Sequence, residues 1–240
     1  LPWFKRHATE DVGQGAHVTR ARSTALAGVY VLGMALTYAV AGVAAGLSGT
    51  LLSAALIWLL CRRAGAEKTG CVAAAVFLLS GLVFAVGTYG VLDAHLSFFV
   101  MLAMTAFYYA YTERNLWKQA GYLAVAGAGV GLAFLTKGLL GFVLPAVAIA
   151  PFLLWQKEWK RMFTLPWIPL VVALAVIAPW TLAVHRADPD FWHQFIGVEH
   201  FQRFTSGQGA NDDRSQPFWF FLPVLLGGML PWTLFAPAVW

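Results

Sequence analysis

Long uninterrupted apolar runs limit what this chain can fold into more than any other feature. They recur along the whole sequence and are separated by short charged segments. A helix needs about 20 apolar residues to cross a bilayer core of about 30 Å, and backbone inside the core must be helical or part of a closed barrel. The runs are continuous rather than alternating, which favours helices. The sequence therefore predicts an all-α, polytopic membrane protein.

Composition supports this class and argues against others. The chain is 60% hydrophobic and 11% charged, whereas soluble domains carry about 25% charged residues. A net charge of +5 could indicate nucleic acid, but the basic residues stand in short clusters between the runs, as membrane topology requires, so no nucleic-acid partner is expected. Cys61 and Cys71 lack ligand or CxxC spacing, so they indicate neither a disulfide nor a metal site.

We expect about eight transmembrane helices. The runs that predict them cover residues 23–47, 51–61, 69–90, 94–112, 121–135, 139–155, 165–184 and 217–240. Ser48 and Gly49 predict a tight turn between the first two runs. The chain begins without methionine or the apolar core of a signal peptide, so we interpret it as a fragment or a fusion.

The charged segments between the runs predict the sidedness of the protein. Lys and Arg predominate in residues 1–22, 62–68, 113–118 and 157–161. Counting spans places all four segments on the cytoplasmic side, in agreement with the positive-inside rule. Asp93, Lys137 and the segment 185–216 then share the extracytoplasmic face.

The segment 185–216 holds a third of the ionisable side chains of the chain, including three histidines, interleaved with Phe and Trp. This mixture predicts a loop that lies against the membrane surface and carries the chemistry. A solvated connector is the alternative, although a connector needs neither the aromatic side chains nor the histidines.

Asp93 and Lys137 each stand at the end of an apolar run, where a charged side chain is energetically costly and therefore indicates a structural or functional role. Asp93 either caps the following helix or orients a substrate or supports a base in an aqueous cavity. Lys137 either extends to the interface or binds a lipid-borne phosphate as a point charge, with Gly138 leaving nearby backbone amides accessible.

Within the segment 185–216, three side chains could hold ligands. His200 and Arg203 have the i, i+3 spacing that shares a helical face. Glu199 and His200 could ligate a divalent metal, and Arg203 could hold a phosphate. Two metal ligands alone are a weak signal, and interfacial anchoring is the alternative for each of the three residues.

Four motifs carry a family resemblance: GVLDAHLSFF, FLTKGLLGFVLP, APWTLAVHRADPDFWHQFIGVEHFQRF and RSQPFWFFLPVLLGGMLPW. From about residue 58 to 240 the chain resembles the phospholipid-carrier-dependent glycosyltransferases of the protein mannosyltransferase superfamily, most closely the aminoarabinose transferases that modify lipid A. The resemblance implies a partial GT-C fold in the bacterial inner membrane. It also implies that 4-amino-4-deoxy-L-arabinose or a related sugar is transferred from an undecaprenyl-phosphate carrier to lipid A or another glycolipid at the periplasmic face.

The same resemblance implies roles for the candidate residues. Asp93 would be the second acid near the catalytic site, Lys137 and Arg203 would contact the carrier phosphate, and Glu199 with His200 would border a divalent metal ion. The family pattern also includes a first span and a large outer loop with a catalytic aspartate, and this sequence shows neither. We therefore expect little or no transferase activity from this chain alone.

Residues 15–56 resemble instead a transmembrane segment of the thiol:disulfide interchange protein DsbD. This implies two units, residues 1–56 and residues 57–240, and an alternative function as a membrane electron relay. A redox relay needs a reactive cysteine pair, but Cys61 and Cys71 lie outside the matching segment. A scaffold or transporter is a third hypothesis. It is less favoured because the charged residues cluster at span ends rather than at mid-span.

Overall fold

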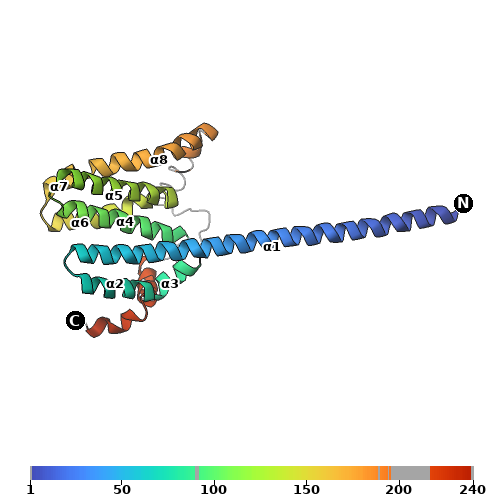
Figure 1. The fold of residues 1–240 in the computed structure, drawn as a ribbon, viewed down its shortest axis with the longest axis horizontal. Helices are drawn as coiled ribbons and strands as arrows, with labels where there is room; N and C mark the ends of the chain where they lie inside the picture. Colours follow the sequence, from blue (N-terminus) through green and yellow to red (C-terminus); the bar gives the residue numbers. More distant parts are fainter. Residues whose placement is uncertain (1, 90–91, 189, 194, 196–216, 239–240) are drawn as a thin grey trace.

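The computed structural model is a bundle of helices from which one long helix projects (Figure 1). The structure describes residues 2–89, 92–188, 190–193, 195 and 217–238. Its α-helices are α1 (Pro2–Arg63), α2 (Glu67–Leu79), α3 (Gly81–Thr88), α4 (Leu92–Thr112), α5 (Leu116–Lys137), α6 (Leu140–Trp155), α7 (Trp159–Thr164), α8 (Trp167–Ala187) and α10 (Phe221–Gly228). Two 3-10 helices flank α10, η3 (Phe218–Phe220) and η4 (Trp232–Ala238). No strand occurs within these ranges, so the all-α prediction is confirmed.

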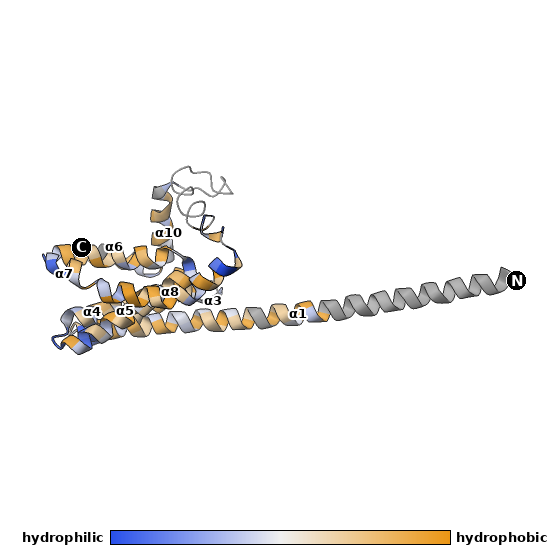
Figure 2. Cartoon of the chain, turned by 90° about the horizontal axis from the view of Figure 1, so that it is seen from above, coloured by the Kyte–Doolittle hydropathy of each residue, from blue (hydrophilic) through white to orange (hydrophobic). Residues whose placement is uncertain are grey.

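The helices have the lengths and the apolar surfaces of membrane spans. Apolar residues cover the helices of the bundle and polar residues gather near its ends (Figure 2). Four described segments are long and apolar enough to cross a bilayer: Val29–Arg63, Leu92–Thr112, Leu116–Lys137 and Trp159–Ala187. The pair α2 and α3, bent by 63°, would make a fifth, while α6 is shorter. The chain is a multi-pass membrane protein, but the expected number of eight spans stays a prediction.

The turn predicted at Ser48 and Gly49 is wrong, because α1 continues through both residues. The Ser48 hydroxyl donates to the carbonyl of Ala44 at 2.7 Å and so remains inside the helix. Gly49 lies where α1 meets α4, and a Cβ there would be 3.0 Å from the carbonyl oxygen of Ala94. The two runs assigned to separate spans therefore belong to one helix, and glycine serves close packing rather than a turn.

Residues 217–240 also differ from the predicted single span. The described part of this segment forms an eight-residue helix, α10, with a 3-10 helix on each side. Pro231 follows the end of α10 and has no amide proton to continue a helix.

Helix α5 lies between α4 and α8, and glycines make its close contacts. A Cβ on Gly129 would be 3.0 Å from backbone atoms of α4, and one on Gly131 would be 2.9 Å from Val176 of α8. Gly127, one turn before Gly131, lies directly against the backbone of Pro169. In membranes, where lipid is as apolar as the helices, small residues of this kind let helix backbones approach and pack.

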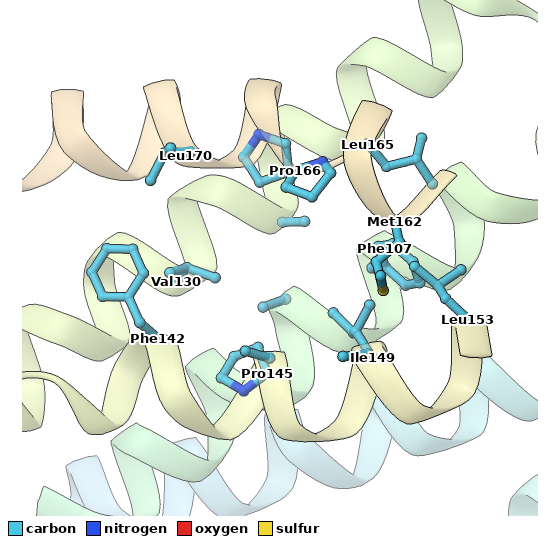
Figure 3. Close-up of a pocket in the computed structure, with 15 residues that line it drawn as sticks. Phe107, Val130, Phe142, Pro145, Ile149, Leu153, Met162, Leu165, Pro166 and Leu170 are labelled. Carbon is cyan, nitrogen blue, oxygen red and sulfur yellow. The ribbon is translucent and has the colours of Figure 1, made fainter. Parts of the chain in front are cut away.

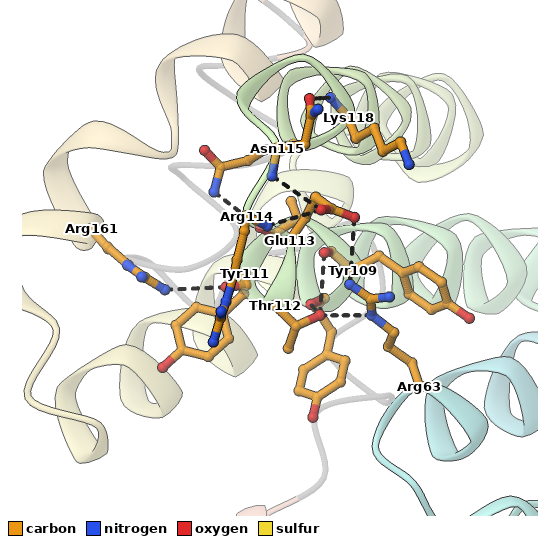
Figure 4. A network of polar contacts seen from close by, with 12 residues as sticks. Arg63, Tyr109, Tyr111, Thr112, Glu113, Arg114, Asn115, Lys118 and Arg161 are labelled. Atoms are coloured by element: carbon orange, nitrogen blue, oxygen red, sulfur yellow. Dashed lines mark hydrogen bonds and ion pairs between the residues drawn. The ribbon is translucent and has the colours of Figure 1, made fainter.

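The end of α4 is tied to its neighbours by two arginines (Figure 4). Arg63, at the end of α1, donates from Nε to the Thr112 hydroxyl at 2.8 Å, and its guanidinium lies 5.1 Å from the centroid of the Tyr109 ring. Arg161 lies 4.8 Å from the Tyr111 ring centroid and donates to the carbonyl of Tyr111 at 3.2 Å.

These contacts place residues 62–68, 113–118 and 157–161 at one end of the bundle, which we call the basic end. Their predicted common side is confirmed. Residues 1–22 do not share it, because α1 passes along the bundle only once and its first turns project from the opposite end (Figure 1). The prediction for residues 1–22 is wrong, and its source is the turn wrongly placed at Ser48.

Candidate functional site

Asp93 and Lys137 meet at the end of the bundle opposite the basic end. Asp93 stands in the first turn of α4 and Lys137 in the last turn of α5. Because these neighbouring helices run antiparallel, the start of one lies beside the end of the other. The ammonium of Lys137 donates to Oδ1 of Asp93, and the two side chains remain 45% and 43% exposed. The prediction that they share one face is confirmed by direct contact.

The backbone favours this pair as well. An acid in the first turn of a helix and a cation in the last turn each complement the helix dipole. Helix α4 begins at Leu92, so Asp93 lies inside the first turn rather than at the capping position that the sequence allowed as an alternative. The Lys137 ammonium has three N–H donors. One is directed at Asp93, and no partner among the described residues occupies the others, which can bind an anion.

Gly138 ends α5 and starts the turn into α6. Its φ of 66° lies in the left-handed region, where glycine is unstrained. Its amide donates to the carbonyl of Phe134 at 2.7 Å, and its carbonyl accepts from Gly141 at 3.0 Å. The amide of Gly138 itself is therefore not available to a ligand, and the accessibility of the nearby backbone amides stays a prediction.

A cavity of about 350 Å³ borders Asp93. Its walls come from α1, α2, α3 and the start of α4, and they are mainly apolar. Three hydroxyl side chains, Thr50, Ser53 and Ser97, also line it. Thr50 and Ser53 donate to carbonyls of their own helix at 2.9 and 2.8 Å, which leaves their oxygen lone pairs as acceptors. The carboxylate thus faces both a cation and a cavity with polar groups.

His95 follows Asp93 by two residues and is a site residue that was not predicted from the sequence. Its Nδ1 is buried and has no hydrogen-bond partner among the described residues. A buried polar group without a partner is uncommon in proteins. Its presence within GVLDAHLSFF, next to the predicted acid, is the signal that could have drawn attention to it.

An aromatic cluster holds the start of the segment 185–216 at the same end. The Trp180 ring of α8 lies 5.8 Å from Phe191 and 6.3 Å from Phe195, measured between centroids. Phe134, one turn before Lys137, lies 6.2 Å from Phe195. The described start of this segment therefore packs against α5 and α8 beside Lys137, on the predicted face.

Arg203, Glu199 and His200 lie outside the described residues. Within the described ranges, no group of three or more His, Cys, Asp or Glu side chains could hold a metal ion. The divalent metal and the second phosphate contact therefore stay predictions.

Comparisons with known proteins point to one family. The family model for Dolichyl-phosphate-mannose-protein mannosyltransferase matches residues 24–195. An undecaprenyl phosphate-alpha-4-amino-4-deoxy-L-arabinose arabinosyl transferase from Shewanella sediminis is 39% identical over 195 residues, which is 81% of this chain and 35% of that protein. A protein of the same name from Erwinia tasmaniensis is 39% identical over 188 residues, 78% of this chain and 33% of its own length.

Solved structures agree with these relatives. ArnT from Cupriavidus metallidurans bound to undecaprenyl phosphate is similar with a TM-score of 0.73 and 25% identity over 83% of this chain and 36% of that chain. Its apo state is similar in fold, with a TM-score of 0.69 at 24% identity, over 82% of this chain and 35% of that one. The chain thus spans about a third of the length of the proteins that it matches.

The resemblance of residues 15–56 to DsbD gains no support from these comparisons. The family match begins at residue 24 and so includes most of that segment. Helix α1 also runs through residues 56 and 57 without a break. The division of the chain into residues 1–56 and 57–240 stays a prediction.

Proposed function

This chain belongs to the Dolichyl-phosphate-mannose-protein mannosyltransferase family, and on that premise we propose that it holds the carrier-phosphate site of a membrane glycosyltransferase. The substrate would be an undecaprenyl-phosphate-linked sugar, because the relatives described above carry that donor in their names and a similar structure binds undecaprenyl phosphate. The sugar is 4-amino-4-deoxy-L-arabinose or a close relative, and the acceptor is lipid A or another envelope glycolipid.

The contact between Lys137 and Asp93 is the observation that carries this proposal. In the reaction, an oxygen of the acceptor attacks the anomeric carbon of the sugar. The bond from that carbon to the carrier phosphate breaks, and undecaprenyl phosphate leaves with the bonding electrons. A cation that stabilises the departing phosphate lowers the barrier. Lys137 supplies that cation, and its remaining N–H donors, which no described residue occupies, can bind phosphate oxygens.

Asp93 is proposed to keep Lys137 in place and to orient the acceptor from the bordering cavity. Arg203 would add a second phosphate contact, and Glu199 with His200 would hold a divalent metal ion that offsets further charge.

The orientation proposed for this site is periplasmic, in a bacterial inner membrane. Among residues 62–68, 113–118 and 157–161, eight side chains are Lys or Arg and three are Glu. The positive-inside rule places such an end in the cytoplasm. The Asp93–Lys137 pair, at the opposite end, would then face the periplasm.

Binding of the carrier tests the proposal directly. The 240-residue chain would be placed in nanodiscs of neutral lipid and titrated with undecaprenyl phosphate, with undecaprenol as the ligand that lacks the phosphate. We expect Lys137→Gln to weaken binding of the phosphate by about tenfold or more, because a charge-assisted hydrogen bond is lost. Binding of undecaprenol should be unchanged.

Lys118→Gln is the matched control, since it removes the same charge at the basic end and should leave carrier binding intact. The proposal is wrong if Lys137→Gln and the unmodified chain bind undecaprenyl phosphate equally. It also fails if the unmodified chain does not discriminate between undecaprenyl phosphate and undecaprenol.

A further inference from the structure

A second cavity, of about 320 Å³, opens between α6 and the start of α8 and is lined by apolar residues (Figure 3). Pro145 and Ile149 of α6 lie on one side, and Pro166 and Leu170 lie on the other. Residues of α4 and α5 line it as well, and Met162 of α7 lies at the basic end. A cavity with these apolar walls excludes water and can accept hydrocarbon, such as a lipid acyl chain.

The turn that leaves α6 beside this cavity has an unusual residue at its centre. Lys157 has a φ of 57°, the left-handed region that L-residues rarely adopt. Its amide donates to Leu154 at 3.0 Å and the amide of Glu158 donates to Leu153 at 3.0 Å, which is the Schellman pattern of a helix end. Leu153 itself lines the cavity.

Helix α1 ends in the same pattern with a glycine in this position. Gly65 has a φ of 80°, its amide donates to Arg62 at 3.1 Å, and the amide of Ala66 donates to Cys61 at 2.9 Å. Glycine is unstrained in this conformation and lysine is not. What Lys157 adds over a glycine is an exposed ammonium at the end of α6, four residues after Leu153 of the cavity wall, which indicates a role beyond the turn.

None of the three glutamates at the basic end forms an ion pair with the ammonium of Lys157. Their three carboxylates are each paired with an arginine, in the ion pairs Arg62–Glu67 at 4.0 Å, Arg63–Glu113 at 3.7 Å and Arg161–Glu158 at 3.6 Å. Lys157 and Lys160 are exposed and have no ion pair with any described residue. Trp155 and Trp159, 87% and 58% exposed, stand two residues before and after Lys157, and Trp159 also precedes Lys160. Exposed tryptophans of this kind are enriched at membrane interfaces.

We propose that this place binds one anionic phospholipid from the leaflet at the basic end. An acyl chain fills the cavity between α6 and α8, and the headgroup phosphate lies on Lys157 and Lys160. Lys157 and Lys160, which have no ion pair with a described residue, suit an anionic headgroup, and the apolar walls of the cavity suit an acyl chain. A helix packed into the cavity would satisfy the apolar walls and leave these cations without a partner. The site lies at the opposite end of the bundle from Asp93 and Lys137, so it is independent of the carrier site.

Native mass spectrometry of the purified 240-residue chain tests this inference. The probes are phosphatidylglycerol and phosphatidylcholine with identical acyl chains. Removing both lysines in K157Q/K160Q should lower the affinity for phosphatidylglycerol about 30-fold and leave phosphatidylcholine unaffected. The matched control is K68Q/K118Q, which removes two cations from the same end at the starts of α2 and α5 rather than between Leu153 and Met162 of the cavity wall. Equal losses in the two double variants would mean general surface attraction and would overturn the proposal.

Two further variants separate lipid binding from folding. Lys157→Gly relieves the left-handed strain, so the melting temperature should not fall, while the affinity for phosphatidylglycerol should still drop. Unchanged affinity in this variant would exclude the role of Lys157.

Ala150→Trp, on the cavity side of α6, should block the acyl chain, whereas Val147→Trp, on the exposed outer side of α6, should not. If Ala150→Trp keeps the lipid, the chain does not enter the cavity and the proposal is wrong. If Ala150→Trp instead abolishes a dimer, a helix of a second copy fills the cavity and the proposal is equally wrong.

Discussion

Asp93 and Lys137 show how two charges at the ends of apolar runs can serve structure and chemistry together. Both are about half exposed, so their mutual attraction is screened and contributes little to folding. An exposed pair of this kind can open without a large loss of stability. Its value for the proposed function is that a phosphate can compete with Asp93 for the ammonium of Lys137.

This competition predicts opposite effects for the two neutral variants. We expect Asp93→Asn to raise the affinity for undecaprenyl phosphate by about two- to tenfold, because it removes a negative charge close to the phosphate and releases Lys137. Lys137→Gln should lower it. The measurement is the same nanodisc titration at low ionic strength, repeated at high salt, where both effects should shrink. Weaker binding in both variants would indicate that the pair only maintains the local structure.

Glu113, in the turn between α4 and α5, gives a prediction about pH. The backbone amides of Asn115 and Arg114 donate to its carboxylate at 3.1 and 2.9 Å, and these bonds, with Arg63 nearby, lower the pKa of Glu113 below its ordinary value. A carboxyl with a lowered pKa stabilises the fold above its unfolded-state pKa. That contribution is lost as the pH falls through the folded-state pKa.

Glu113→Gln should therefore lower the melting temperature at pH 7, and the difference from the unmodified chain should shrink as the pH is lowered below 4.5, the ordinary pKa of a glutamate, and through the folded-state pKa of Glu113. Thermal unfolding followed by circular dichroism in detergent measures this. Glu67→Gln, in an exposed pair with Arg62, is the control and should have a smaller effect at pH 7. A difference for Glu113→Gln that persists unchanged at low pH would rule out the charge of Glu113 as its cause.

At the scale of elements, the glycines of α5 decide how closely the bundle packs. A Cβ on Gly127 would meet the backbone of Pro169, which cannot move away as a side chain can. We expect Gly127→Ala to destabilise the bundle by about 1–3 kcal/mol through overpacking. Gly121→Ala in the same helix has open space around its new methyl group and should be neutral or stabilising by up to about 1 kcal/mol.

Unfolding of both variants in SDS from mixed micelles would measure the difference. Because the two substitutions are chemically identical and share a helix, helix propensity cancels between them. Equal stabilities would show that α5 and α8 do not pack through Gly127.

The elements differ in how well the sequence predicted them, and membrane physics explains why. The runs of α4, α5 and α6 end at charged or polar turns, so composition alone located them to within a few residues. Gly49 misled the prediction because glycine marks turns in soluble proteins, whereas in a membrane helix it also marks close packing. Span counting placed Asp93 and Lys137 at one face, but only the packing of α4 against α5 brings the two side chains into contact.

At the scale of the whole molecule, the continuous helix α1 places residues 1–22 on the opposite side of the membrane from residues 62–68, whereas span counting had placed both on the same side. The basic end carries eight cations and three acids, whereas residues 1–22 carry four Lys or Arg and two acids. The larger excess of positive charge is expected to decide the orientation, and it favours the basic end in the cytoplasm. Since α1 crosses only once, residues 1–22 must then emerge on the side of Asp93 and Lys137.

Single cysteines in a C61A/C71A background test this arrangement with a maleimide that cannot cross membranes. Thr9→Cys and Arg186→Cys should react in spheroplasts, whereas Lys118→Cys should react only in inverted vesicles. Thr9→Cys tests whether residues 23–61 cross the membrane once, as α1, or twice, with a turn at Ser48. Two crossings would place residue 9 on the same side as residue 118. Labelling at positions 9 and 118 from the same side would show that α1 does not cross as one helix. Labelling at position 186 from the cytoplasm would place the Asp93–Lys137 site on the wrong side for a periplasmic transferase.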